Sequence, residues 1–181
     1  MTFLCSDILQ INISYELEEH RVIRVSNLYS VVINAPPETV FNYVSDLTRH
    51  PEWSGGKLKI EALTLGPLAV GSQYKSYGDV AGQQNRPNEL RVTKFESPTL
   101  FEFVAKDPGF GEVVNKFKFT PQKGGTLMER TLSMNMNPLK AFAFKLFIRP
   151  LIGQPMMDKS FATLKDKLEA ENSSVKHNKE K

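Results

Sequence analysis

The chain has 181 residues, of which 40% are apolar and 24% charged, a composition typical of one globular domain with a substantial core. The formal charge of +3 partly reflects the basic end "VKHNKEK", and no run of Lys and Arg interleaved with aromatics occurs elsewhere, so we expect no nucleic-acid partner. A single cysteine, Cys5, excludes an intramolecular disulfide and favours a reducing compartment. The first twenty residues make a poor signal peptide, and the longest apolar run is too short for a membrane span, so we expect a cytoplasmic protein.

Three regions can be distinguished along the chain. Residues 1–20 form an N-terminal extension without a clear pattern, residues 21–171 carry regular helix and strand patterns, and residues 172–181 predict a disordered tail. The patterned region opens with "RVIRVSNLYSVVINA", a predicted strand rich in Val and Ile. A short amphipathic helix follows in "PPETVFNYVSDL", where a proline suits the first helical turn, and it ends before Pro51.

Six further strands are predicted between residues 57 and 137, separated by turn-rich breaks such as "DPG" and "KGG". Short connections imply hairpins, and successive hairpins imply an antiparallel meander. In "ELRVTKF", Leu90 and Val92 favour one face of the strand and Phe95 the other, a conflict that a β-bulge would resolve.

The chain is predicted to become helical again after these strands. Pro138 can open a helix that ends near Arg149, and a second helix is expected to begin near Pro155 and to carry one apolar stripe from Met157 onward. This is the only predicted element long enough to cover the sheet. The sequence therefore predicts an α+β fold, in which a curved antiparallel sheet grips a long, Pro-broken C-terminal helix.

Five segments are informative in their order and spacing: "VVINAPPETVFNYVSDLTRHPEWS", "GPLAVGSQYKSY", "RVTKFESPTLFEF", "FKFTPQKGGTLMERTLSM" and "SFATLKDKLEA". Together they resemble the START and birch-pollen-allergen (SRPBCC) superfamily over roughly residues 22–170, and most closely its bacterial polyketide cyclase/dehydrase and lipid-transport group. The resemblance implies the helix-grip fold, with a seven-stranded antiparallel sheet, a long C-terminal helix and an apolar cavity between them. It also implies binding of lipids, sterols, quinones, hormones or aromatic polyketides, with catalysis in a minority of members.

We expect no metal centre and no cofactor. The three histidines and the one cysteine do not stand at metal-ligand spacing. The sequence also lacks a nucleophile elbow, a phosphate-binding loop and a dinucleotide fingerprint.

One acid–base pair is conceivable near the end of the first helix, where Asp46 and His50 stand four residues apart. The two side chains could form a dyad at a cavity mouth. Alternatively, Asp46 caps the chain and His50 sits in solvent near the helix C-terminus, where positive charge is favoured.

Alternation along the strands places mainly apolar side chains on one face, with Asn115 and Arg130 as polar points among them. Apolar walls with a few polar groups are typical of ligand cavities. Two readings stay open for Arg130, which either lines the cavity or reaches water or an acid at the rim, and Asn115 could be a structural amide. Trp53 is either a cavity contact or a core plug. The candidate ligand-binding residues are Trp53, Tyr74, Phe103, Asn115, Phe117, Arg130, Met157 and Phe161.

The segment "LKAFAFKLFIRPLI" is apolar on nearly all sides and carries interspersed cations. It could simply cover the sheet. The alternative is transient contact with a membrane through Phe142, Lys145, Phe147 and Arg149.

Two functions are therefore predicted from different classes. The first is binding or transport of a small hydrophobic molecule, lipid-like or aromatic, in a cavity between sheet and C-terminal helix. The alternative is a polyketide cyclase/aromatase-type enzyme that uses the same cavity. A third hypothesis is a scaffold whose cavity is filled by side chains. The lack of a convincing acid–base pair favours binding.

Overall fold

The computed structural model describes residues 22–55, 57–80, 83–107 and 111–179, and the predicted N-terminal extension lies outside these residues. Among these residues, one strand and two short helices come first, six strands follow, and three helical segments end the chain. In chain order the elements are β1 (Ile23–Ile33), α2 (Pro37–Ser45), the 3₁₀ helix η1 (Leu47–Glu52), β2 (Leu58–Ala62), β3 (Gln73–Val80), β4 (Gln83–Glu96), β5 (Leu100–Asp107), β6 (Gly111–Gln122), β7 (Gly125–Met136), α3 (Pro138–Ala143), the π-helix η2 (Phe144–Gly153) and α4 (Gln154–Lys179).

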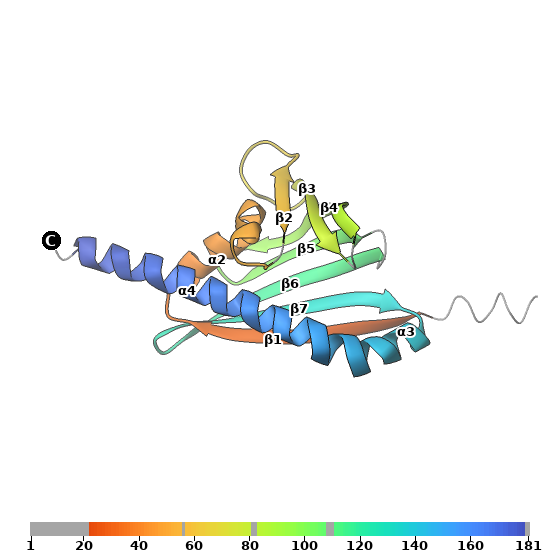
Figure 1. Ribbon diagram of the computed structural model, residues 1–181. Coiled ribbons are helices and arrows are strands. Elements are labelled where there is room, and N and C mark those ends of the chain that lie inside the picture. The colour runs from red at the N-terminus through yellow and green to blue at the C-terminus, as the bar shows by residue number, and fades with distance from the viewer. Residues whose placement is uncertain (1–21, 56, 81–82, 108–110, 180–181) are drawn as a thin grey trace, which may run out of the picture.

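The strands form one sheet in the order β1-β7-β6-β5-β4-β3-β2, and every neighbouring pair is antiparallel. Strands β2 to β7 follow each other as a meander, because their short connections allow only neighbouring hairpins. Strand β1 then pairs with β7 at the sheet edge. Figure 1 shows the curved sheet with α4 running across it. The predicted α+β fold, a curved antiparallel sheet with a long C-terminal helix, is confirmed.

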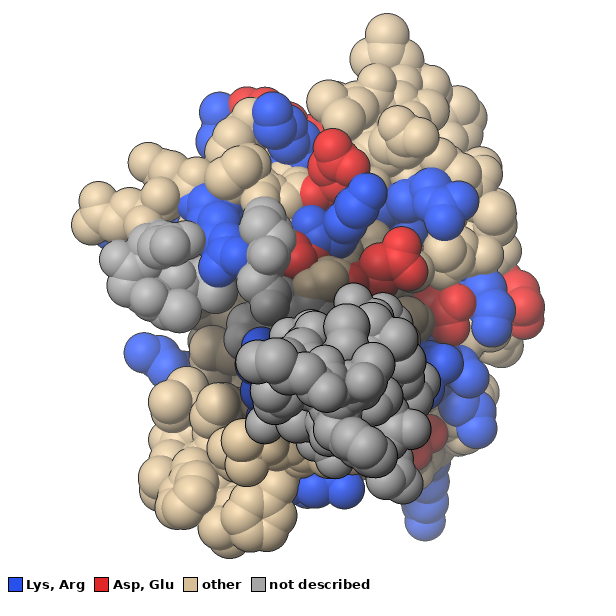
Figure 2. All heavy atoms as spheres, turned by 90° about the vertical axis from the view of Figure 1, so that its right-hand side faces the viewer, with Lys and Arg blue, Asp and Glu red and all other residues tan. Residues whose placement is uncertain are grey.

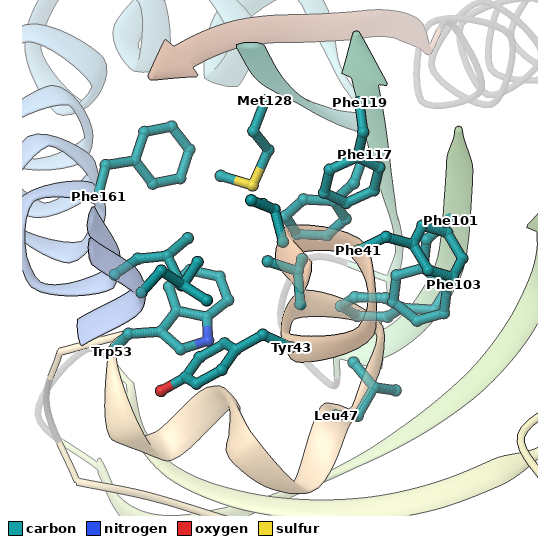
Figure 3. Packing of buried hydrophobic residues seen from close by; sticks show 14 of the residues in the cluster. Phe41, Tyr43, Leu47, Trp53, Phe101, Phe103, Phe117, Phe119, Met128 and Phe161 are labelled. Atoms are coloured by element: carbon teal, nitrogen blue, oxygen red, sulfur yellow. The ribbon is translucent and has the colours of Figure 1, made fainter. Parts of the chain in front are cut away.

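The inner face of the sheet carries the core, and aromatic side chains dominate it. Phe101 on β5 and Phe117 on β6 are fully buried, with ring centroids 6.2 Å apart. The predicted bulge in β4 is present as a register shift between Val92 and Lys94, and it turns Phe95 inward. Each fully buried Phe contributes about 1.5–3 kcal/mol relative to an exposed one. Figure 3 shows this aromatic cluster.

The segment after β1 closes one end of this core. Helix α2 has Pro37 at its first turn and stops at Ser45, because Asp46 adopts an extended conformation. The Asp46 carboxylate accepts a hydrogen bond from the Thr48 backbone N–H at 3.0 Å, which caps η1. Pro51 lies inside η1, and the turn that follows inserts Trp53 into the core with 1% of its surface exposed.

The C-terminal helix is interrupted around Pro150, although not by a loop. Helix α3 ends at Ala143, before the predicted end near Arg149, and the α-helical pattern resumes at Gln154, one residue before the predicted start. Between them the backbone is π-helical and contains Pro150. Proline lacks the N–H that an α-helix needs at this position, and a π-helical stretch accommodates that loss while the chain stays helical.

The far end of α4 is fixed to the start of the domain by polar contacts. Glu169 accepts a hydrogen bond from the Asn34 backbone N–H at 2.8 Å, and the Asn172 side chain donates to the Asn34 carbonyl at 2.9 Å. Arg49 forms an ion pair with Glu171 at 3.0 Å. Partly exposed pairs of this kind contribute little energy each, but together they set the helix position.

The helix also continues through residues 172–179, where the sequence predicts a disordered tail. That prediction rested on the missing apolar stripe. Hydrogen bonds replace the stripe at the start of this stretch, because Ser173 and Ser174 donate to backbone carbonyls one turn earlier and Asn172 bonds to Asn34.

In the β6–β7 hairpin, Gly125 lies against the backbone at the end of β1. Any side chain at this position is therefore expected to destabilise the protein. A Cβ at Gly125 would overlap the Ile33 carbonyl oxygen and lie 2.9 Å from Asn34 Cα. We expect Gly125→Ala to lower the free energy of unfolding by about 1–3 kcal/mol, because backbone must move to accept the methyl group. Gly78→Ala is the matched control, since a Cβ there meets nothing closer than 3.5 Å. Equal midpoints in urea unfolding for the two variants would contradict this account.

Candidate functional site

The centre of the candidate site is Arg130, on the inner face of β7. Its neighbours in the sheet register are Tyr29 on β1 and Phe117 on β6. The guanidinium donates from Nη2 to Asn115 Oδ1 at 2.7 Å, and its carbon lies 5.2 Å from the centroid of the Phe117 ring. Two neighbouring strands, β6 and β7, therefore place one cation, one amide and one aromatic face in contact.

The rest of the Arg130 guanidinium has weak partners. Nη1 lies 3.5 Å from the Met157 sulfur of α4, and Nε is inaccessible and lacks a hydrogen-bond partner among the described residues. No ion pair of the described residues includes Arg130. Burial lowers the pKa of Arg130 to about 10, and the nearby Tyr29 acts in the opposite direction. The group is therefore a cation at neutral pH that no described acid neutralises.

Asn115 orients this cation. Its Oδ1 accepts from Arg130, so its Nδ2 must be the donor, and Nδ2 reaches the Val113 carbonyl at 3.3 Å. Both polar ends of the amide are engaged, and the side chain is only 4% exposed. The hydrogen bond to the Val113 carbonyl fixes the Asn115 amide, and the fixed amide in turn orients the Arg130 guanidinium.

His50 lies in the core, contrary to the expectation of a solvent-exposed side chain. Its ring lies 4.7 Å from Trp53 and 5.8 Å from Phe103, measured between centroids, and Nε2 is 2.8 Å from the Val44 carbonyl oxygen. Burial lowers the pKa of His50 to about 3, and the charge of Arg130 adds to that effect. His50 is therefore neutral at pH 7, and Nε2 is the protonated nitrogen that donates to the carbonyl.

The Asp46–His50 dyad does not form. Asp46 accepts from the backbone N–H and the hydroxyl of Thr48, which is the capping alternative that the sequence left open. The i, i+4 spacing brings two side chains together only on a continuous α-helix, and the helix ends between these residues.

The other predicted site residues divide into two groups. Trp53, Phe103 and Phe161 are buried in the same cluster as Phe117, and Figure 3 shows Phe161 and Met128 pointing toward each other from α4 and β7. The Trp53 indole nitrogen has no hydrogen-bond partner among the described residues. Tyr74 is also buried on the inner face, but it lies three strands further from β7 than Phe117.

Some side chains on the inner face are partly exposed to solvent, although their neighbours are fully buried. Arg130 and Leu132 on β7, Val113 on β6 and Val31 on β1 are half-buried, whereas Met128 is fully buried. Leu132 is the register neighbour of Asn115, so these positions adjoin the polar contact described above. The site therefore combines an apolar wall, one oriented cation and several side chains that solvent still reaches.

Two site features were not predicted from the sequence. Tyr29 is buried next to Arg130, and its hydroxyl lies near Gly153 of η2. Asn27, two residues earlier, is 3% exposed, and its Nδ2 has no partner among the described residues. The alternation of Val25, Asn27 and Tyr29 in β1 was the available signal, because period two assigns all three to one face.

Two other features of the described residues bear on the site. No three His, Cys, Asp or Glu side chains among them are arranged to hold a metal ion. A hollow of about 340 Å³ is lined by residues of β3 to β6, among them the predicted site residue Tyr74, and Glu89, Arg91, Lys106 and Glu112 give its lining both signs of charge. No described helix is long and apolar enough to cross a membrane.

Comparisons with known proteins agree with the fold. A family model described as polyketide cyclase / dehydrase and lipid transport matches residues 24–169. The comparison with curated proteins found no match. Among solved structures, the chain is similar to SA2116 from Staphylococcus aureus, a protein of unknown function, with 14% identity and a TM-score of 0.62 over 81% of this chain and 97% of that one.

Two further solved structures show the same likeness. A protein from Rhodobacter sphaeroides has 16% identity and a TM-score of 0.63 over 83% of this chain and 99% of that one. Ara h 8.0201 has 13% identity and a TM-score of 0.58 over 81% and 98%. At such identities the structures establish the fold and not the activity.

The buried, neutral His50 predicts a specific loss of stability in acid. Its pKa is about 3 in the fold and about 6.5 in an unfolded chain, so the unfolded chain binds more protons between these values. Stability present above about pH 6.5 is lost as the pH falls toward 3, by up to about 1.4 kcal/mol per pH unit. Urea unfolding at several pH values should show a steeper loss for the wild type than for His50→Gln. Parallel pH dependences would contradict a neutral, buried His50.

Proposed function

Since the chain belongs to the polyketide cyclase/dehydrase and lipid transport family, we propose that it binds a small hydrophobic molecule, lipid-like or aromatic, between the inner face of the sheet and the C-terminal helix. The observation that carries the proposal is the Arg130 cation, which stands on an apolar wall without a described acid. A buried charge is costly unless it is paired, and a ligand can supply the missing partner. The single cysteine supports a cytoplasmic location.

The ligand's polar end is the part that Arg130 binds. Asn115 already occupies Nη2, and the only described partner of Nη1 is the Met157 sulfur at 3.5 Å, which is a weak acceptor. Nη1 is therefore the donor that a stronger acceptor of the ligand, such as a carboxylate, would engage. Hydrogen bonds between charged groups are the strong ones, and arginine matches carboxylate geometry. Asn115 acts as a positioning residue for the guanidinium.

Aromatic and thioether side chains form the wall against which the apolar part of the ligand packs. Phe117 and Met157 contact Arg130 directly, so they flank the polar end. Val113 and Leu132 pack against this wall but stay partly exposed, so a ligand placed there would bury further apolar surface. The remaining members of the proposed wall are Trp53, Tyr74, Phe103 and Phe161.

Catalysis on such a molecule, as in a cyclase, needs a group that moves a proton near neutral pH. At the described site the candidates are His50, with a pKa of about 3 and a bond to the Val44 carbonyl, and Arg130, with a pKa of about 10. Neither value lies near 7. These observations favour binding over catalysis.

The proposal predicts that Arg130 discriminates between charged and neutral apolar probes. We expect Arg130→Met to weaken binding of the anionic dye 1-anilinonaphthalene-8-sulfonate about tenfold or more, because a charge-assisted contact is lost. Binding of the neutral dye N-phenyl-1-naphthylamine should change little. Leu132→Trp should weaken both dyes, because the larger ring fills the space beside Asn115. Fluorescence titration measures both affinities.

Arg24→Met is the matched control, since Arg24 is exposed at the start of β1. It should leave both affinities unchanged. If Arg130→Met weakened the affinities for both dyes equally, Arg130 would not be the polar anchor, although the proposed cavity would stand. No effect of Leu132→Trp on either dye would contradict the cavity itself.

A further inference from the structure

Exposed apolar side chains are concentrated in one short part of the molecule. Of the fifteen large apolar side chains that the described residues leave exposed, eight lie on α3, η2 and the first turn of α4. We name this set the α3–η2 surface. Its members are Leu139, Phe142, Leu146, Phe147, Ile148, Leu151, Ile152 and Met156, with exposed fractions between 42% and 77%. Contiguous exposed apolar groups of this kind mark an interaction site.

The segment does not need these side chains to hold its place. Ala141 of α3 and Phe144, the first residue of η2, pack against Val25 and Met134 at the ends of β1 and β7, and these contacts attach the segment to the sheet. Although most of its sequence is apolar, η2 has no fully buried residue. A helix that only covered the sheet would turn its apolar side chains inward, so the outward ones serve another contact.

Charge on this segment has one sign. Lys140, Lys145 and Arg149 lie among the apolar residues, and no Asp or Glu occurs between residues 138 and 157. Figure 2 views the end of the molecule where α3 lies, and uncharged side chains gather at its lower left with Lys and Arg atoms beside them. Apolar side chains flanked by cations are the combination that binds the interface of an anionic bilayer.

We propose that the α3–η2 surface docks onto an anionic lipid bilayer, with Phe142, Phe147 and Leu151 entering the interface and Lys145 and Arg149 pairing with lipid headgroups. Charge complementarity selects this partner over a second copy of the chain. In a two-fold dimer the surface would face itself, and its cations would meet without an acid from the same surface to neutralise them. The proposal goes beyond ligand binding and does not depend on it.

Vesicle flotation tests the proposal with full-length protein. The wild type should float with vesicles of phosphatidylcholine and phosphatidylserine, and at least about tenfold less with phosphatidylcholine alone. Phe147→Glu/Leu151→Glu should abolish flotation, because acids replace the apolar anchors at exposed positions where folding does not depend on them. Lys145→Glu/Arg149→Glu should remove the preference for phosphatidylserine.

Matched controls separate docking from general surface effects. Leu65→Glu/Val70→Glu changes two apolar residues that are 94% and 63% exposed in the β2–β3 connection, and Lys116→Glu/Lys118→Glu removes two exposed cations on β6. Both controls should float like the wild type. The proposal is overturned if the wild type does not float with phosphatidylserine vesicles, or if the controls lose binding as the α3–η2 variants do. It is also overturned if Phe147→Glu/Leu151→Glu converts a dimer to a monomer in light scattering without changing flotation.

Discussion

The constraint behind this structure is that one helix cannot cover the inner face of a seven-stranded sheet. Seven strands at their usual spacing are about 29 Å wide, whereas a helix with its side chains is about 10–12 Å across. The chain responds by curving the sheet and by closing one end with α2, η1 and Trp53. The rest of the inner face is left to α4 and to side chains that stay partly exposed. The candidate site lies in that remainder.

Arg130 is the position where this constraint has chemical consequences. In a sealed core an arginine without an acid would be destabilising, and hydrophobic replacement would improve stability. Here the guanidinium is held in one place by Asn115, Phe117 and Met157, but no described carboxylate forms an ion pair with it. An oriented cation without a paired acid lowers the stability of the ligand-free protein. The same arrangement strengthens binding of a ligand that carries an anionic or acceptor group.

Much of this architecture could be predicted from the sequence, because strand alternation and turn residues are local signals. The bulge near Val92 followed from period two alone, because Leu90 and Val92 favour one face and Phe95 the other. The burial of His50 could not be predicted, since it depends on α2 ending at Ser45 and on the turn that inserts Trp53. Alternation likewise placed Arg130 on the inner face but could not decide whether an acid from another element would reach it.

Uptake of an apolar molecule with an acceptor group between sheet and helix can be examined by native mass spectrometry of the wild-type protein, followed by extraction with organic solvent. The mass should exceed that of the bare chain, and extraction should release a small apolar molecule that carries a carboxylate or a similar acceptor. A bare chain under gentle conditions, from protein that also fails to take up 1-anilinonaphthalene-8-sulfonate, would contradict uptake of such a molecule.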